Sequence, residues 1–235
     1  EYQTIDEFLE RNLIKVQKPG RYVGGEFNQI TKEWDKTLIH VALAFPDIYD
    51  IGFPNLGISI LYDIINKRVD SLAERVFSPW LDMEQLLQEN KIPLFSLENK
   101  KPIKEFDLIG FSIPYETLYT NVLNMLFLSD IPVWSKDRGP SAPIIIAGGH
   151  STFNPEPMHA FIDLFVIGDG EEVVEEIIDE ISIAKEKNIS RFETIKNLSQ
   201  ISGVYNPSAF EVEYNPDNTI QQYVYANQSD HGKII

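Results

Sequence analysis

Apolar and polar positions form blocks along the chain that predict strands alternating with helices. Nearly continuous apolar runs, typical of strands buried on both faces, occupy residues 38–45, 107–113, 143–147 and 163–167, with shorter candidates at 73–79 and 92–99. Apolar residues at helical spacing follow several of these runs, at 58–68, 82–90, 117–130 and 170–188. This alternation predicts parallel βαβ units, and therefore an α/β, doubly wound parallel sheet of Rossmann-like type with about five strands.

The two ends of the chain have different patterns. Apolar residues at helical spacing between positions 5 and 13 predict one short helix that docks on the core, and a glycine-rich loop follows it. The pattern changes within residues 203–228, where 210–214 and 219–226 alternate with period two on either side of the turn residues NPDN, which predicts a β-hairpin before a polar tail. We therefore expect three parts: a lead-in (1–36), the sheet domain (37–200), and a hairpin with a linker (201–235).

Composition narrows the class of protein. The chain has 235 residues, of which 43% are hydrophobic, enough for one sizeable core, and no apolar stretch is long enough to span a membrane. The amino-terminal residues lack the pattern of a signal peptide, so we expect a cytoplasmic protein. A net charge of -16 favours solubility and argues against a nucleic-acid partner. The sequence has no cysteine, which excludes disulfides, thiolate metal sites and cysteine nucleophiles within it.

The loops that follow the strands matter most, because doubly wound sheets bind ligands at the carboxyl ends of their strands. The first such loop holds Gly52 and Gly57, and a glycine that opens a helix lets the backbone approach a ligand. A plain strand-to-helix turn would also need a small residue there. The second loop holds Ser112 and Tyr115, whose hydroxyls could contact a ligand, although Ser112 could instead cap local backbone groups.

A third loop carries the strongest signal. Gly148 and Gly149 follow an apolar run, so a strand ends where its backbone can lie flat against a large group; tight strand–helix packing is the alternative. A second glycine pair closes the next strand, and two such strand ends so close together favour a binding site. The further candidate residues of this segment are Thr152, Gly168, Gly170 and Glu171.

Common catalytic motifs do not occur in the sequence. It has no Gly-x-Ser-x-Gly elbow and no Gly-x-x-x-x-Gly-Lys loop, and the spacing of Gly52 and Gly57 departs from the dinucleotide fingerprint. His150 and His159 lie near the third loop, but a metal site needs three or four converging ligands, so we expect no metal there. The carboxylates near strand ends that could form an acid pair are Asp47, Asp50 and Glu116.

Several segments between Lys18 and Tyr214 occur in a characteristic order. They are KPGRYVGGEFN, VALAFPDIYDIGFPNLGISILYDIIN, AERVFSPWLDMEQLL, LFSLENKKPIKEFDLIGFSIPYE with TNVLNML, and AGG, TFNPEP and IGDGEE. Together they resemble the N-terminal region of an uncharacterised family of cobalamin-binding-type radical S-adenosylmethionine (radical SAM) proteins. The resemblance implies a cobalamin-binding, Rossmann-like domain. It also implies a following barrel domain with a three-cysteine motif, which binds a 4Fe-4S cluster and S-adenosylmethionine and is the partner of this domain.

The cobalamin-binding pattern of such domains is Asp-x-His-x-x-Gly, with the histidine as the lower ligand of cobalt. When its glycine is set at Gly57, Pro54 stands at the histidine and Gly52 at the aspartate, and Asn55 is the nearest polar residue. The resemblance therefore implies cobalamin without a protein ligand below the cobalt. The remaining positions of the pattern correspond to Ser112, Gly148 and Gly149, at longer spacings than in mutase-type domains.

Three hypotheses follow. In the first, cobalamin lies over the 52–57 loop with its tail running toward Gly148 and Gly149, where a bulky side chain would block the tail and leave the core intact. In the second, the domain is a corrin-free scaffold that docks on the radical SAM barrel or forms a homodimer. In the third, it is an independent enzyme with an unrecognised site. The glycine loops favour the first and the absent histidine favours the second; in neither does this part of the protein have catalytic residues of its own.

Overall fold

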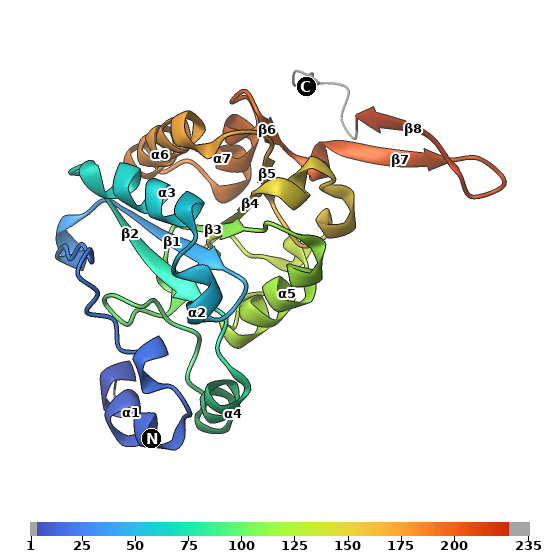
Figure 1. Cartoon of the computed structure of the whole chain (residues 1–235). Helices are drawn as coiled ribbons and strands as arrows, with labels where there is room; N and C mark the ends of the chain where they lie inside the picture. Colours follow the sequence, from blue (N-terminus) through green and yellow to red (C-terminus); the bar gives the residue numbers. More distant parts are fainter. Residues whose placement is uncertain (1–3, 226–235) are drawn as a thin grey trace.

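One layer of β-strands lies between two layers of helices (Figure 1). The computed structural model describes residues 4–225, and over this range the central sheet has six strands in the order β2-β1-β3-β4-β5-β6. Strands β1 to β5 are parallel and β6 is antiparallel to β5, which confirms the predicted α/β, doubly wound sheet. The strands are β1 (Ile39–Phe45), β2 (Ser71–Phe77), β3 (Leu108–Ser112), β4 (Ile144–Gly148), β5 (Leu164–Val166) and β6 (Val204–Tyr205).

Continuous burial explains the composition of the central strands. Every residue of β1 is buried, and its sequence IHVALAF is almost wholly apolar, as a strand covered by helices on both faces requires. All seven residues of β2 are buried as well, although two of them, Glu74 and Arg75, are charged. Charged groups in the interior need polar partners. The Glu74 carboxylate accepts hydrogen bonds from the Asn99 amide and side chain, and the partners of Arg75 are described below.

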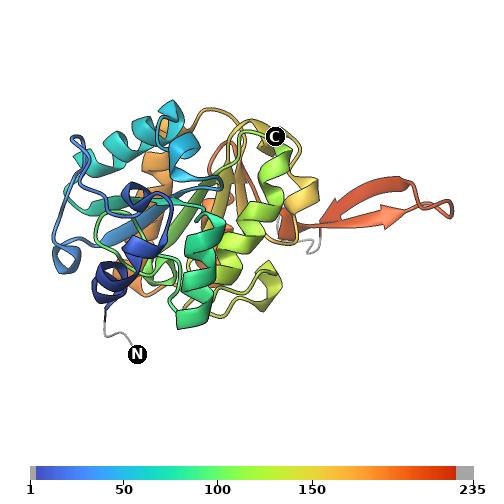
Figure 2. The ribbon, with the colours of Figure 1, turned by 60° about the horizontal axis from the view of Figure 1, so that its bottom comes forward.

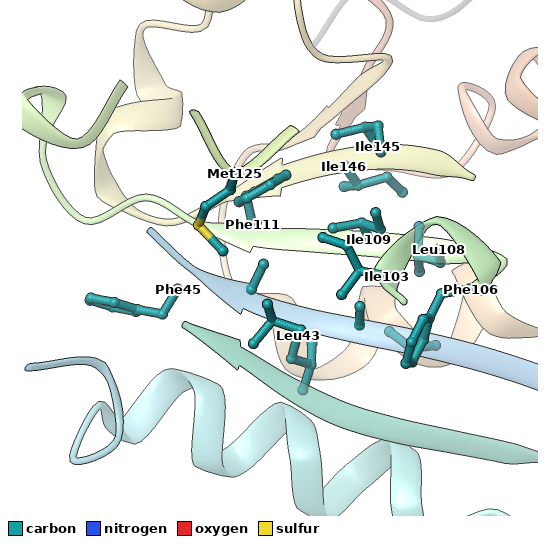
Figure 3. Packing of buried hydrophobic residues seen from close by; sticks show 14 of the residues in the cluster. Leu43, Phe45, Ile103, Phe106, Leu108, Ile109, Phe111, Met125, Ile145 and Ile146 are labelled. Atoms are coloured by element: carbon teal, nitrogen blue, oxygen red, sulfur yellow. The ribbon is translucent and has the colours of Figure 1, made fainter. Parts of the chain in front are cut away.

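Helices cover both faces of the sheet. One face carries α3 (Leu56–Lys67), α6 (Gly170–Lys187) and α7 (Arg191–Leu198), and the other carries α4 (Leu81–Asn90) and α5 (Tyr119–Leu128) (Figure 1). Figure 3 shows Phe111 of β3 beside Met125 of α5, whereas Leu43 of β1 lies on the opposite face. Because successive side chains of a strand point to opposite faces, each strand contributes to two separate core layers.

The amino-terminal lead-in contains the predicted short helix, α1 (Ile5–Asn12). Thr4 caps this helix, since its hydroxyl oxygen accepts a hydrogen bond from the Glu7 amide at 3.1 Å. Phe8 is fully buried, so the helix is docked on the core as its apolar spacing predicted. The glycine-rich segment that follows runs without regular strands toward β1.

The strand order identifies one point where the sheet reverses direction. The chain proceeds from β1 to β2 on one side and then returns to place β3 on the other side of β1. In doubly wound sheets with the order 2-1-3-4-5, ligands bind outside the carboxyl ends of the strands at this point, between β1 and β3. A ligand-binding site is therefore expected at the carboxyl edge of the sheet, between β1 and β3.

Several local predictions were wrong. Residues 92–99 form no strand and contribute only an isolated bridge between Phe95 and Pro102. The predicted hairpin is confirmed as β7 (Phe210–Tyr214) and β8 (Ile220–Tyr225). The preceding Val204 and Tyr205 form β6 of the main sheet, a strand that was not predicted. Two residues carry no recognisable periodicity, so this strand had no signal of its own. Helix α2 (Tyr49–Gly52) interrupts the first loop, and α7 was not predicted.

The free edge of β2 is closed by side chains and loops. The Asn66 carboxamide pairs with both backbone groups of Ala73, at 3.0 Å each. The Arg75 amide donates to the Glu98 carboxylate at 2.8 Å, and the Arg75 carbonyl accepts from the Leu97 amide at 2.8 Å. Residues 92–99 therefore have a strand-like sequence for a structural reason. They form hydrogen bonds to the backbone of Arg75 at the edge of β2, but they do not pair with β2 as a regular strand. Strand addition is blocked at this edge.

Two further predictions concern the ends and the environment of the chain. No helix within residues 4–225 combines the length and the apolar character that crossing a membrane requires. The predicted polar tail, residues 229–235, lies outside the described residues.

Candidate functional site

Ser112 and Gly148 are register partners at the carboxyl ends of β3 and β4. The Ser112 side chain is half-buried, and its hydroxyl makes no hydrogen bond to the part of the chain that the structure describes. A Cβ atom placed on Gly148 would meet nothing closer than 3.9 Å, where it would approach Val166. The Ser112 hydroxyl thus has no hydrogen-bond partner among the described residues and lies beside Gly148, next to the point where the strand order reverses.

The Ser112 side chain points to the face of the sheet that α3 and α6 cover. Leu43 is in register with Arg75 on one side and with Gly110 on the other. The Arg75 guanidinium lies over the ring of Tyr62 in α3, 4.6 Å from its centroid, which identifies their common face. Ser112 follows Gly110 by two residues, and residues two apart in a strand share a face.

The amino ends of α3 and α6 lie on this same face. A Cβ atom on Gly170, the first residue of α6, would be 3.4 Å from the Leu61 side chain of α3, so the two helices approach closely at this point. Gly57 is exposed in the first turn of α3. Gly168 has a φ of +119° in the turn before α6, and no atom lies within 4 Å of where its Cβ would be. Glu171 is exposed in the first turn of α6.

Three predicted site residues have structural roles instead. A Cβ atom on Gly52 would lie 2.6 Å from the Phe77 ring, so this glycine is required by aromatic packing. Asn55 caps α3, because its side-chain oxygen accepts the Ile58 amide at 3.0 Å. The Thr152 hydroxyl is buried and lies 2.7 Å from the Gly149 carbonyl oxygen. None of these groups is free to bind a ligand without local rearrangement.

The prediction that a bulky side chain at Gly149 would leave the core intact is wrong. Its φ is +105°, a conformation that favours glycine, and a Cβ atom would lie 2.9 Å from the Ile113 carbonyl oxygen. The Ser151 hydroxyl donates to this same oxygen at 2.7 Å. The space over Gly149 is therefore filled by the end of β3, and only Gly148 retains open surroundings. Gly149 is therefore required for close packing against Ile113, whereas Gly148 leaves space beside Ser112.

Exposed apolar side chains lie on the loops of this edge, and of these only Tyr115 was predicted from the sequence as a site residue. Leu56 is 71% exposed after β1, Tyr115 is 41% exposed after β3, and Phe153 is 67% exposed after β4. Trp80 and Leu81 are exposed after β2. The signal was present in the sequence as large apolar residues inside turn segments. Several such side chains along one edge are typical of a contact surface rather than of water-facing loops.

A buried charge cluster lies at the β2 side, away from Ser112. Arg75 pairs with Glu98 at 2.7 Å and with Glu26 of the lead-in at 3.5 Å, and Tyr49 donates to Glu26 at 3.1 Å. Burial raises the pKa of Glu98 to about 7, although Arg75 opposes the shift. The cluster attaches the glycine-rich lead-in to the sheet. A pocket next to it, lined by residues such as Tyr22, Phe77 and Met83, contains none of the predicted site residues.

Asp50, one of the candidates for an acid pair, is held in ion pairs, and the histidines of the third loop have local contacts. Lys18 and Arg21 bind the Asp50 carboxylate at 2.7 and 2.5 Å and lower its pKa to about 2, which makes it an ion-pair partner and not a proton donor. His159 is hydrogen-bonded through Nδ1 to the Glu156 carbonyl at 2.6 Å, and His150 lies near the Phe153 ring. Between residues 4 and 225 no three potential His, Asp or Glu ligands converge.

Two comparisons bear on the family of the chain. The sequence model of the family described as "Radical SAM proteins, N-terminal" matches residues 57–207, well over half of the chain. An uncharacterized protein of Methanocaldococcus jannaschii is 25% identical over 147 residues, which are 61% of this chain but 27% of that protein. The chain thus spans about a quarter of the curated relative it matches. The radical SAM part of the resemblance is confirmed, and its cobalamin-binding part stays a prediction. The chain belongs to the family of N-terminal domains of radical SAM proteins.

Proposed function

We propose that this domain is the cobalamin-binding module of a radical SAM protein and performs no catalysis of its own. The observation that supports this most is the unengaged Ser112 hydroxyl beside the open backbone of Gly148, at the edge where the sheet reverses. A doubly wound sheet binds its ligand at this point. A binding role also fits the candidate acid and metal residues better than an enzymatic one, because Asp50 is held in ion pairs and His159 is hydrogen-bonded to a local carbonyl.

The residues of the carboxyl edge fit parts of such a cofactor. Ser112 would hydrogen-bond the tail of cobalamin, and Gly148 would leave room for it. Leu56, Tyr115 and Phe153 offer apolar surface to the macrocycle, since a large ligand is held mainly by apolar contact with a few placed polar groups. Bound cobalamin would supply a cobalt centre that can carry a methyl group.

The same residues offer cobalt no ligand from below. Pro54 has no donor atom, and the Asn55 carboxamide is already engaged as the cap of α3. Affinity must then come from contact area and from hydrogen bonds to the periphery of the cofactor. The 4Fe-4S cluster and S-adenosylmethionine belong, in this proposal, to the region that follows the domain, because thiolate ligands are needed and this sequence has no cysteine.

A titration of the full-length protein with cobalamin, followed by visible absorption, tests the proposal. We expect saturable binding by the wild type and at least a tenfold weaker affinity for Gly148→Val, because the added methyl groups occupy the opening beside Ser112. Gly139→Val is the matched control, since Gly139 is exposed and a Cβ there meets no atom within 4 Å. Thermal melting of each variant verifies that it is folded.

Absence of cobalamin binding by the wild type would reject the proposal. Binding with a dissociation constant of 1 mM requires only about 4 kcal/mol. If the wild type shows none at that concentration, the cofactor function fails. If Gly148→Val binds as well as Gly139→Val, cobalamin is held elsewhere and the role given to Ser112 and Gly148 is wrong.

A corrin-free scaffold is the second candidate function. It is favoured by Gly149 and Thr152, which close part of the path that the resemblance assigns to the tail of the cofactor. In this case the apolar side chains of the carboxyl edge would contact another protein domain, either the radical SAM region or a second copy of the chain. The same titration separates the two functions, because a scaffold binds no cobalamin.

A further inference from the structure

The β7–β8 hairpin stands away from the rest of the domain. Figures 1 and 2 show it projecting beyond the helices and the central sheet in two different views. Its two strands pair with each other and form a sheet separate from the central one. An isolated two-stranded hairpin is at best marginally stable in water, so this element needs a further contact to be held in place.

One face of the hairpin is apolar. Val212 pairs with Tyr223, and Tyr214 pairs with Ile220. An irregularity of the register at Glu213 and Tyr214 produces the second pair, because an unshifted ladder would place Gln221 opposite Tyr214. Tyr214, Ile220 and Tyr223 are 61%, 52% and 45% exposed. The bulge therefore maintains an apolar face whose outer residues Tyr214, Ile220 and Tyr223 are exposed.

The opposite face and the turn are acidic. Glu211 and Glu213 alternate with the apolar residues of β7, and Asp217 lies in the turn. Residues 203–225 include neither lysine nor arginine. The hairpin thus presents aromatic and aliphatic side chains on one face and negative charge on the other. Its apolar face is therefore the one suited to contact an apolar patch of a partner.

The root of the hairpin is fixed on the sheet. The rings of Tyr205 in β6 and Phe210 in β7 are stacked with their centroids 5.7 Å apart. The Tyr205 hydroxyl donates to the Glu156 carboxylate at 2.7 Å, which attaches the root to the loop after β4. These contacts cover the root of the apolar face at Phe210 and leave Tyr214, Ile220 and Tyr223 exposed.

We infer that the apolar face of β7 and β8 packs against the radical SAM region that follows this domain in the full-length protein. The family is N-terminal by its description, and the hairpin comes directly after the matched residues 57–207. The relative from Methanocaldococcus jannaschii is long enough to contain such a region, since this chain covers 27% of it. The inference rests on the radical SAM part of the proposed function and is independent of cobalamin.

Hydrogen–deuterium exchange of the hairpin peptide in the full-length protein tests the inference. We expect the amides of β7 and β8 in the wild type to be protected like those of the central sheet. Ile220→Lys should raise their exchange rate at least tenfold, because it places a charge in the covered face. Gln222→Lys, which adds the same charge opposite Glu213 on the polar face, should leave the rate unchanged.

Three results would overturn the inference. The hairpin of the wild type could exchange as fast as an unstructured loop, or both lysine variants could behave alike. Alternatively, Ile220→Lys could convert a dimer to a monomer in sedimentation, and the occupant would then be a second copy of the chain. Cobalamin titration of the same variants keeps the two proposals apart, since neither substitution touches Ser112 or Gly148.

Discussion

The amino and carboxyl edges of the central sheet have different chemistry. At the amino edge Asp163, just before β5, is buried between two arginines, with Arg138 at 3.0 Å and Arg191 at 2.5 Å. Its carboxylate also accepts the Ile145 amide at 2.8 Å. At the carboxyl edge the Ser112 hydroxyl has no partner among residues 4–225, and large apolar side chains face solvent.

A second ion cluster repeats the pattern of the amino edge. Asp107, just before β3, accepts the His40 amide at 2.8 Å and pairs with Lys185 of α6 at 2.7 Å. Burial tends to raise the pKa of Asp107, but hydrogen bonds from His40 and Lys185 outweigh it and lower the pKa. Trp34 of the lead-in stacks on the His40 ring with centroids 3.8 Å apart. The amino ends of β1, β3, β4 and β5 are thus closed by ion pairs and hydrogen bonds of Asp107 and Asp163.

This difference separates residues that hold the fold from residues that can bind. Charges held in ion pairs at the amino edge specify which loop closes which strand. Unengaged and apolar groups at the other edge add little to stability, so they require another explanation, which a ligand or a partner domain supplies. Substitutions at the two edges should therefore change different properties.

The largest expected effect is at the amino edge. Asp163→Asn removes the charge that neutralises Arg138, and an uncompensated buried charge costs about 3–5 kcal/mol. Denaturant unfolding of the chain should show this loss as a lower midpoint. Asp179→Asn is the control, because the Asp179 side chain is 61% exposed in its pair with Arg68 and such pairs contribute at most about 1 kcal/mol. Equal midpoints for the two variants would show that the buried charges of the amino edge do not stabilise the fold more than an exposed ion pair does.

Sequence reasoning recovered the sheet because the signal of its strands is local. The apolar runs that became β1, β3, β4 and β5 need no knowledge of their neighbours, and the helices follow from apolar spacing. The two-residue β6 and the loop at 92–99 could not be assigned, because their role depends on pairing with β5 and with Arg75. Long-range pairing is not encoded in a local pattern.

The candidate site was predicted in part for the same reason. The sequence located the strand ends, and Ser112 and Gly148 do meet there. It could not show that Gly52 and Gly149 are glycines because of Phe77 and the Ile113 backbone, since each contact joins separate loops. A glycine that is required for packing and one that leaves space for a ligand look identical in a single sequence.

Two adjacent glycines give the next largest effect. Gly149→Ala should destabilise the chain by about 1–3 kcal/mol, because the residue keeps a positive φ and its Cβ meets the Ile113 carbonyl. Gly148→Ala should change the free energy of unfolding by no more than about 0.5 kcal/mol, as at sites without special contacts. Thermal or denaturant unfolding of both variants measures the difference. Equal losses would show that Gly148 is also a packing position, and the opening beside Ser112 would lose its support.

The smallest effect distinguishes two hydroxyls of the carboxyl edge. Thr152 is buried, and its hydroxyl lies within hydrogen-bonding distance of the carbonyls of Gly149 and Val166, at 2.7 and 3.0 Å, whereas that of Ser112 has no partner within the described range. Thr152→Val should cost about 1 kcal/mol, the net contribution of a typical hydrogen bond. The Gly149 carbonyl keeps the backbone amide of residue 152 as a donor, at 3.1 Å. Ser112→Ala should leave the unfolding midpoint within error.

The Ser112 variant also connects stability to binding. If its hydroxyl serves a ligand, Ser112→Ala weakens cobalamin binding in the titration by about 1 kcal/mol, about fivefold, while the fold keeps its stability. A loss of stability without a loss of affinity would mean that Ser112 belongs to the core, like Thr152. A loss of neither would leave the hydroxyl without a function, and the carboxyl edge would then act through its apolar side chains, as the scaffold function requires.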